Sequence, residues 1–151
     1  MEYKIKYATM DELNSWMELV RLVSWNFPGL ETEELLDGYK NTVIKNINRK
    51  SAICAVSEDK VVGILLFSTK YNMLCCMAVH PAYRKRGIAK RMMKEMMSNL
   101  DKNRDIIVDT FREEDSKGIA PRALYTSFGF EPAELVENFG YPNQRFVLRA
   151  K

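Results

Sequence analysis

The stretch MAVHPAYRKRGIAKR, residues 77–91, is the most informative segment of this chain. It ends an apolar, strand-like run over residues 73–79, passes through a basic turn that contains Gly87, and enters an amphipathic run over residues 88–100. The first N–H groups of a helix have no partner within it, and the helix dipole favours negative charge in front of them. Gly87 has no Cβ atom, so the backbone can come close to a bulky anion. The stretch therefore predicts a site for the phosphates of a nucleotide cofactor.

The motif at this turn differs from two common phosphate-binding motifs. A P-loop needs Gly, four residues and then Gly-Lys-Ser/Thr, and the dinucleotide fingerprint needs three glycines where this turn has one. The pattern Arg84-x-x-Gly87-x-Ala89 instead resembles the pyrophosphate loop of the GNAT superfamily, the acyl-CoA-dependent N-acetyltransferases. A second block, ALYTSFGF at residues 123–130, resembles the penultimate helix of that family and its Gly-Phe exit. The spacing between the blocks leaves room for a helix, a strand and a loop, as the family requires.

Length and composition favour one globular domain over residues 1–151. The chain has 46% hydrophobic residues and contains no repeat, low-complexity tract or linker. The net charge of +3 does not require a nucleic-acid partner. Basic residues nevertheless gather in one segment, and such a local patch suits a polyphosphate better than a long duplex: Arg84, Lys85, Arg86, Lys90, Arg91 and Lys94.

The cysteines and the N-terminus indicate a cytoplasmic protein. Three cysteines, two of them adjacent at Cys75 and Cys76, do not form a disulfide framework, which suggests a reducing interior. Residues 1–7 lack the apolar core of a signal peptide, and no apolar run approaches membrane-spanning length, so we expect no membrane partner. His80 is the only histidine and has no suitably spaced ligands nearby, so we expect no metal site.

The hydrophobic pattern predicts the element order β-α-α-β-β-β-α-β-α-β-β. This order indicates an α/β (α+β layered) chain, and it matches the GNAT fold, a mixed, mostly antiparallel central sheet flanked by helices. The expected strands cover residues 3–7, 52–56, 61–68, 73–79, 106–110, 131–136 and 145–149. The first expected helix runs from a capping box at residues 9–12 to about Trp25, and the others cover residues 32–48, 88–100 and 120–128. Residues 27–29 are expected to break the chain after the first helix, and residues 111–118 are expected to form a charged loop.

Apolar stripes predict the buried helix faces. They consist of Leu13, Trp16, Met17, Val20 and Val23 in the first helix; Leu35, Leu36, Tyr39, Val43, Ile44 and Ile47 in the second; and Met92, Met93, Met96 and Met97 in the third.

The resemblance implies acetyl-CoA as co-substrate and assigns residues to it. In the family the pantetheine arm pairs with the central strand like an added strand, which implies backbone groups of Met77, Ala78 and Val79. The pyrophosphate loop implied by the resemblance comprises Arg84, Lys85, Arg86, Gly87, Ile88, Ala89 and Lys90.

The resemblance also implies Tyr125 as the general acid. Attack of an amine on a thioester expels a thiolate whose parent thiol has a pKa near ~8.5, and a phenol with a pKa near ~10 can protonate it. The alternative is that Tyr125 only packs together with Leu124 and Phe128. His80 precedes Pro81 at a strand end, a position that is usually structural in the family.

The general base is open at this stage. Some relatives carry a glutamate early in the central strand, but residues 73–79 contain no acid. Gly118 stands where relatives often have an asparagine that binds the pantetheine. A water chain, Asp109, Glu113 or Glu114 could receive the proton of the amine.

The sequence predicts an N-acetyltransferase that uses direct transfer to a primary amine in a ternary complex. Two alternatives remain: a non-catalytic acyl-CoA-binding sensor or partner module, and a nucleic-acid-binding protein, which leaves Tyr125 and Gly129-Phe130 unexplained. The sequence leaves four classes of acceptor open: protein N-termini, polyamines, amino acids and aminoglycosides. It also leaves open whether the protein forms a homodimer. Residues 25–28 and 141–143, Trp-Asn-Phe-Pro and Tyr-Pro-Asn, are candidate walls of the acceptor pocket.

Overall fold

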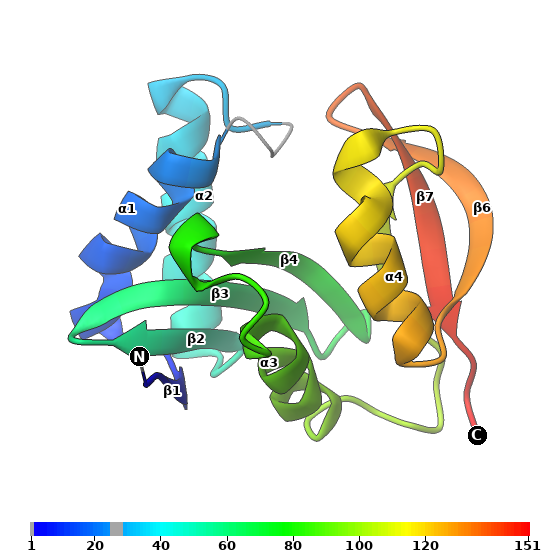
Figure 1. Cartoon of the computed structure of the whole chain (residues 1–151), viewed down its shortest axis with the longest axis horizontal. Coiled ribbons are helices and arrows are strands. Elements are labelled where there is room, and N and C mark those ends of the chain that lie inside the picture. The colour runs from blue at the N-terminus through cyan, green and yellow to red at the C-terminus, as the bar shows by residue number, and fades with distance from the viewer. Residues whose placement is uncertain (1, 25–28) are drawn as a thin grey trace. The chain divides into compact units, whose positions relative to one another are not determined.

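The computed structural model describes residues 2–24 and 29–151, and its elements follow the predicted order (Figure 1). The strands are β1 (Lys4–Tyr7), β2 (Ala52–Ser57), β3 (Lys60–Ser68), β4 (Met73–Val79), β5 (Ile106–Phe111), β6 (Glu131–Asn138) and β7 (Tyr141–Leu148). The helices are α1 (Leu13–Val23), α2 (Glu33–Asn48), α3 (Ile88–Met97) and α4 (Ile119–Ser127), with short 3-10 turns η1 (Met10–Glu12), η3 (Pro81–Tyr83) and η4 (Ser116–Gly118). The strands hydrogen-bond in the order β1-β2-β3-β4-β5-β7-β6, and this mixed, mostly antiparallel sheet confirms the predicted fold class.

The chain divides into two compact units. The first unit holds residues 2–24, 29–67 and 76–99, and the second holds residues 68–75 and 100–151. Strand β4 contributes residues to both units. The expectation of one domain over residues 1–151 stays a prediction. The predicted helix end near Trp25 and the predicted break at residues 27–28 lie outside the described residues.

In the first unit, α1 and α2 pack on one face of β2 and β3. Thr9 and Glu12 form the predicted capping box, which opens η1 and leads into α1. All five residues of the predicted α1 stripe are buried, and Trp16 is fully enclosed. The hydrophobic cluster that they form with α2, β2 and β3 also takes in Cys76 and Ala78 of β4. Burial of this apolar surface is the main force that holds the helices to the strands.

Helix α3 packs on the strands of the first unit at Gly63 of β3. A Cβ atom at Gly63 would lie 2.8 Å from the Ile88 side chain and 3.3 Å from that of Ala55. Gly63 therefore lets the first turn of α3 approach the backbone of β3 closely. Ile88, Met92, Met93 and Met96 are buried beneath the helix, so the position of its N-terminus is set by packing.

Two predictions for the helices of the first unit were wrong in detail. Leu35 was expected in the buried stripe of α2, but it is 41% exposed. Asn46 is buried instead, because its side-chain amide donates to the carbonyls of Ser51 and Phe67. Helix α3 ends at Met97 rather than at residue 100, because Ser98 caps it with backbone bonds to the last turn.

In the second unit, β5, β7 and β6 form an antiparallel ribbon that α4 covers on one face. Phe130 and Phe146 are buried there, and Tyr125 of α4 packs against both rings with centroid distances of 6.1 and 6.3 Å. Phe139 and Gly140 join β6 to β7 with φ angles of 55° and 74°, the values that a tight hairpin turn requires.

Strand β7 begins four residues earlier than expected. Residues 141–144 lie outside the predicted strand, yet they pair with β6 on one side, and Asn143 and Gln144 pair with β5 on the other. Ladder hydrogen bonds to two neighbours outweigh the weak strand propensity of these residues. The predicted charged loop over residues 111–118 is also shorter, because Phe111 extends β5 and residues 116–118 form η4.

Asn72 holds together the two loops at one end of the second unit. The residue is 1% exposed and has a φ of 53°, a left-handed conformation that asparagine tolerates better than most residues. Its amide donates to the carbonyls of Asp101, Arg104 and Asp105 at 2.8 to 3.3 Å, and its Oδ1 accepts from the N–H of Asp101 at 2.8 Å.

We expect Asn72→Ala to lower the free energy of unfolding by about 2–4 kcal/mol, because it strands buried backbone groups and strains a left-handed residue. Chemical denaturation measures this change. Asn103→Ala, at an exposed asparagine of the same loop, is the matched control and should cost much less. Equal effects of the two variants would contradict the bridging role of Asn72.

Candidate functional site

The basic turn ahead of α3 has the backbone shape of an anion-binding loop. We call residues 84–89 the phosphate loop. Arg84 is extended, Lys85 takes a left-handed φ of 62°, and Gly87 is the N-cap of α3 with a φ of 81°. The first intrahelical bond runs from the N–H of Arg91 to the carbonyl of Gly87 at 3.0 Å. The N–H groups of residues 88–90 therefore have no acceptor within the helix, and Gly87 has no side chain to cap them.

His80 shapes the entry to the phosphate loop. Its backbone N–H donates to the Val62 carbonyl at 2.8 Å, and its Nδ1 accepts from the N–H of Ala82 at 3.0 Å, which caps η3. The ring also meets that of Tyr83 edge to face. These contacts give His80 a structural role, as expected from its place before Pro81.

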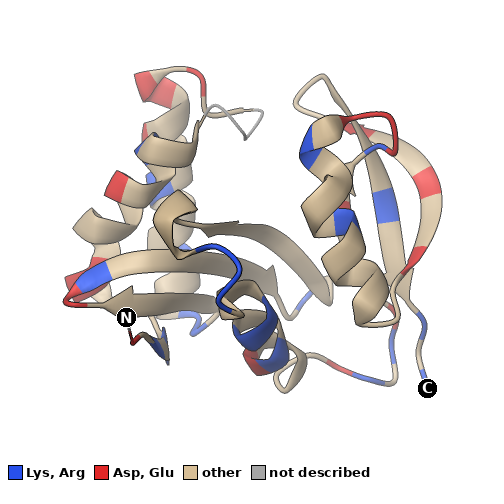
Figure 2. Ribbon diagram, viewed as in Figure 1, with Lys and Arg blue, Asp and Glu red and all other residues tan. Residues whose placement is uncertain are grey.

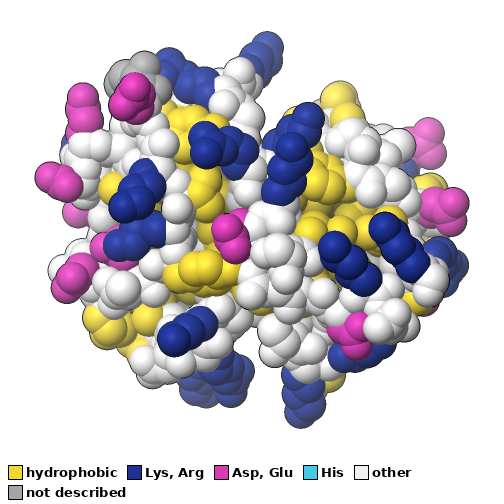
Figure 3. Space-filling model, turned by 90° about the horizontal axis from the view of Figure 1, so that it is seen from below, with side chains coloured by type: hydrophobic (Ala, Val, Ile, Leu, Met, Phe, Trp, Pro, Cys, Tyr) yellow, Lys and Arg dark blue, Asp and Glu magenta, His cyan; other side chains and the backbone are white. Residues whose placement is uncertain are grey.

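The phosphate loop is strongly basic and open to solvent. Arg84, Lys85, Arg86, Lys90 and Arg91 are exposed, and they form the blue segment at the turn and the start of α3 in Figure 2. Lysine and arginine side chains also predominate over acidic ones on the face seen from below in Figure 3. The N-terminus of a helix carries partial positive charge, so it repels cations. A bound anion is attracted by both the cations and the helix end, so this arrangement favours an anion ligand. The loop thus combines N–H donors with positive charge, the two features that favour binding of an anion.

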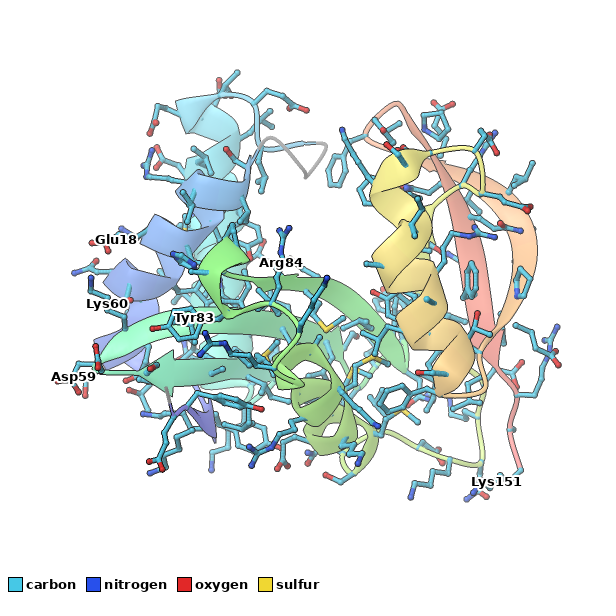
Figure 4. All side chains as sticks on the ribbon, in the orientation of Figure 1. Glu18, Asp59, Lys60, Tyr83, Arg84 and Lys151 are labelled. Atoms are coloured by element: carbon cyan, nitrogen blue, oxygen red, sulfur yellow. The ribbon has the colours of Figure 1, made fainter. Side chains whose placement is uncertain are left out.

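Two arginines near the loop stack on tyrosine rings. The Arg86 guanidinium lies 5.3 Å from the centroid of the Tyr83 ring, and the Arg91 guanidinium lies 5.1 Å from that of Tyr3. Tyr83 and Arg84 are labelled on this turn in Figure 4. Stacking limits the motion of the two charged groups and leaves them available to phosphate oxygens.

The predicted template residues of β4 belong to the first unit. Ala78 packs against the hydrophobic cluster of α1 and α2 together with Cys76. Because side chains alternate along a strand, Met77 and Val79 point to the opposite face, and both are half-buried. The three residues lead directly through η3 into the phosphate loop, so the chain itself brings these predicted groups together.

Tyr125 lies on α4 in the second unit. It is 5% exposed and its ring packs on Phe130 and Phe146, two partners that the sequence analysis did not name. Gly118, at the N-cap of α4, stands where relatives often have an asparagine. A Cβ atom there would lie 2.9 Å from Phe111 Cβ and 3.3 Å from the Arg112 carbonyl. Packing therefore explains why this chain has glycine at that position.

The candidate bases differ in their surroundings. Asp109 accepts two hydrogen bonds from the Arg145 guanidinium at 2.9 and 3.2 Å and a third from Asn138, so both of its oxygens are engaged. Glu113 and Glu114 are exposed.

Among the candidate pocket walls, the Tyr141 hydroxyl donates to Asp115 at 2.6 Å and Asn143 is buried, whereas residues 25–28 lie outside the described part of the chain.

A known protein family matches the part of the chain that contains the phosphate loop. The acetyltransferase (GNAT) domain family matches residues 48–132, more than half of the chain and the part that contains β4, the phosphate loop and Tyr125. The chain belongs to the GNAT family. It is therefore an acyltransferase, and the predicted family and enzyme class are confirmed.

Solved GNAT structures have the same fold over the whole chain. A GNAT-family acetyltransferase from Bacillus cereus superposes with a TM-score of 0.75 at 18% identity, covering 100% of this chain and 99% of its own. A PaiA N-acetyltransferase from Thermoplasma acidophilum, solved in complex with coenzyme A, gives 0.73 at 16% identity, with 99% of each chain covered. A ribosomal-protein-alanine N-acetyltransferase from Brucella melitensis gives 0.74 at 19% identity, covering 97% and 99%. A search of curated proteins found no match.

Two further observations concern metals and membranes. Within residues 2–24 and 29–151, no group of three or more His, Cys, Asp or Glu side chains is arranged to hold a metal ion. None of the helices in that described part of the chain combines the length and the apolar character needed to span a bilayer.

Sequence reasoning missed one residue of this GNAT site. The Tyr3 hydroxyl donates to the carbonyl of Arg86 at 3.1 Å, within the phosphate loop. Tyr3 was assigned only to an alternating strand pattern. No local signal connects two residues that are 83 positions apart, so only the packing of α3 beside β1 reveals the contact.

Proposed function

We propose that this GNAT enzyme moves an acetyl group from acetyl-CoA to a primary amine by direct transfer in a ternary complex. The observation that carries the proposal is the left-handed Gly87 at the N-terminus of α3, set among exposed cations. A pyrophosphate needs this combination of N–H donors, close backbone approach and positive charge. The coenzyme A complex of the structurally similar Thermoplasma acidophilum N-acetyltransferase supports the choice of ligand.

The proposal divides the binding work between two neighbouring segments. The N–H groups of residues 87–90 and the side chains of Arg84, Lys85 and Arg86 would hold the pyrophosphate. The backbone of residues 77–79 would pair with the amide groups of the pantetheine arm, as an added strand pairs with a sheet edge. Binding along two segments that are continuous in sequence fixes the thioester relative to β4.

The chemical step needs one nucleophile and one proton donor. The amine nitrogen attacks the thioester carbonyl carbon, the carbon–sulfur bond breaks, and the sulfur takes up a proton. We propose that the Tyr125 hydroxyl donates this proton. A tyrosine at this position often has that role in the family. The amine loses its own proton to Glu113, Glu114 or water, because the oxygens of Asp109 are engaged by Arg145 and Asn138.

A panel of amines assayed for release of free CoA tests the proposal. The panel should include N-terminal peptides, polyamines, amino acids and aminoglycosides. Acetyl-CoA should raise the melting temperature. Dephospho-CoA and NAD should raise it less, because both lack the 3′-phosphate of CoA and NAD also lacks the pantetheine arm. Absence of acetyl-CoA binding in isothermal titration would refute the proposal.

Direct transfer predicts that no covalent acetyl-enzyme forms. Burial raises the pKa of the Cys54 thiol to about 12, so this thiol stays protonated and inert. The Cys76 sulfur lies 3.6 Å from the hydroxyl of Tyr39, beside the hydrophobic cluster. Cys75 is exposed, but partial desolvation of its sulfur raises its pKa as well.

We therefore expect Cys75→Ala/Cys76→Ala to keep most of the activity, apart from a packing cost at Cys76. Intact-mass measurement after mixing the wild type with acetyl-CoA alone is the direct check. A stoichiometric acetyl adduct that hydroxylamine removes would establish ping-pong chemistry and overturn direct transfer.

A further inference from the structure

Two tyrosines at β1 contact the two ends of α3. The Tyr3 hydroxyl donates to the carbonyl of Arg86, just before the helix. The Tyr7 hydroxyl donates to Glu95 Oε2 at 2.8 Å and accepts from the Asn99 amide at the other end. Arg91 and Glu95 are four residues apart and so lie on one face of α3, between the N-cap Gly87 and Asn99, which follows the helix.

The contact of Tyr3 sets the orientation of one peptide group in the phosphate loop. The carbonyl of Arg86 and the N–H of Gly87 belong to the same planar, trans peptide, so they point in opposite directions. A hydrogen bond that holds the carbonyl towards Tyr3 therefore holds the Gly87 N–H towards the other side. Glycine rotates easily about its backbone bonds, so this peptide would otherwise sample several orientations.

The ring of Tyr3 makes a second contact with the binding residues. It lies under the Arg91 guanidinium at 5.1 Å, one helical turn after Gly87. The Tyr3 hydroxyl oxygen lies 3.8 Å from the position that a Cβ atom of residue 87 would take. The hydroxyl is therefore beside the loop backbone. One side chain therefore restrains both a loop peptide and a cation of the same anion site.

We propose that Tyr3 is a positioning residue for the CoA phosphates. Its hydroxyl holds the peptide between Arg86 and Gly87 in the binding orientation, and its ring holds the Arg91 guanidinium in place. A loop that is ordered before the ligand arrives loses less conformational entropy on binding. The inference rests on the proposed function, because it concerns the same phosphate loop.

The test uses Tyr3→Phe, which removes the hydroxyl and keeps the ring, and Tyr7→Phe as the matched control. Tyr7→Phe also removes a tyrosine hydroxyl that contacts the α3 segment, but at the end far from the loop. We expect Tyr3→Phe to raise the Kd and the KM for acetyl-CoA roughly threefold to tenfold, the worth of one hydrogen bond, with kcat unchanged. Tyr3→Leu, which also removes the stack on Arg91, should weaken binding further.

The control variant Tyr7→Phe should lose stability but not affinity for acetyl-CoA. We expect Tyr7→Phe to lower the melting temperature at least as much as Tyr3→Phe while leaving the KM for acetyl-CoA unchanged. Wild-type affinity in Tyr3→Phe, or equal loss of affinity in both variants, would overturn the positioning role while acetyl-CoA binding by the wild type stands. No binding by the wild type would instead overturn the proposed function, and the inference with it.

Discussion

Replacing Gly87 by glutamate is expected to abolish acetyl-CoA binding. The new carboxylate would lie at the N-terminus of α3, where the pyrophosphate is proposed to sit. Repulsion between like charges about 4 Å apart near a protein surface is worth about 4 kcal/mol, so the loss of affinity should be on the order of 10³-fold. Isothermal titration and the thermal shift with acetyl-CoA both measure it.

The fold should survive this substitution. A Cβ atom at Gly87 would meet only the Tyr3 hydroxyl, at 3.8 Å, so steric crowding in the protein is small. The left-handed φ of 81° costs a non-glycine residue about 1–2 kcal/mol, which a typical domain tolerates.

Gly140→Glu is the matched control for the Gly87 variant. Gly140 has a similar φ of 74°, a Cβ atom there would meet nothing within 4 Å, and the residue lies in the turn between β6 and β7. This variant introduces the same charge and the same backbone strain without touching the phosphate loop. It should bind acetyl-CoA as the wild type does. Binding by Gly87→Glu at wild-type affinity would remove the phosphate loop from the proposal.

Replacing Tyr125 by phenylalanine is expected to lower kcat by about 10²-fold, a usual contribution of general-acid catalysis. The affinity for acetyl-CoA should hardly change, because the substitution removes only the hydroxyl. The contacts of the ring with Phe130 and Phe146 are kept, so the variant should fold. Steady-state kinetics at saturating acetyl-CoA measures the effect.

Single-turnover kinetics makes the Tyr125 experiment decisive, because it isolates the chemical step from product release. Tyr71→Phe is the control, since Tyr71 is 62% exposed and lies in the turn before β4. An unchanged single-turnover rate in Tyr125→Phe would show that Tyr125 serves packing alone. A pure packing role instead predicts a lower melting temperature in Tyr125→Ala with no separate loss of rate in Tyr125→Phe.

The candidate site could be predicted in part because its signals are local. The end of β4, the basic turn and the start of α3 are contiguous in sequence, and each follows from nearby residues: apolar alternation, a glycine, and an amphipathic run. The bounds of β4 and the start of α3 agree with the prediction residue for residue. The identity of the acceptor stays open, because neither the phosphate loop nor β4 carries a motif that specifies it.

The errors arose where distant contacts compete with local propensity. Residues 141–144 lie outside the predicted strand but form the start of β7, because β5 and β6 offer ladder partners. Leu35 fits the apolar stripe of α2 but is exposed, whereas Asn46 is buried by hydrogen bonds to residues that follow the helix.

The sequence by itself determined the family and the element order, and it predicted the phosphate loop. Hydrophobic period, capping residues and a glycine in a basic turn act over a few neighbouring residues, so they can be read without the fold. Only the tertiary structure decided that Tyr3 holds the Arg86 carbonyl, that Arg145 and Asn138 engage Asp109, and that packing excludes a side chain at Gly118. These contacts depend on hydrogen bonds and close packing between segments far apart in the chain, for which a single sequence carries no local pattern.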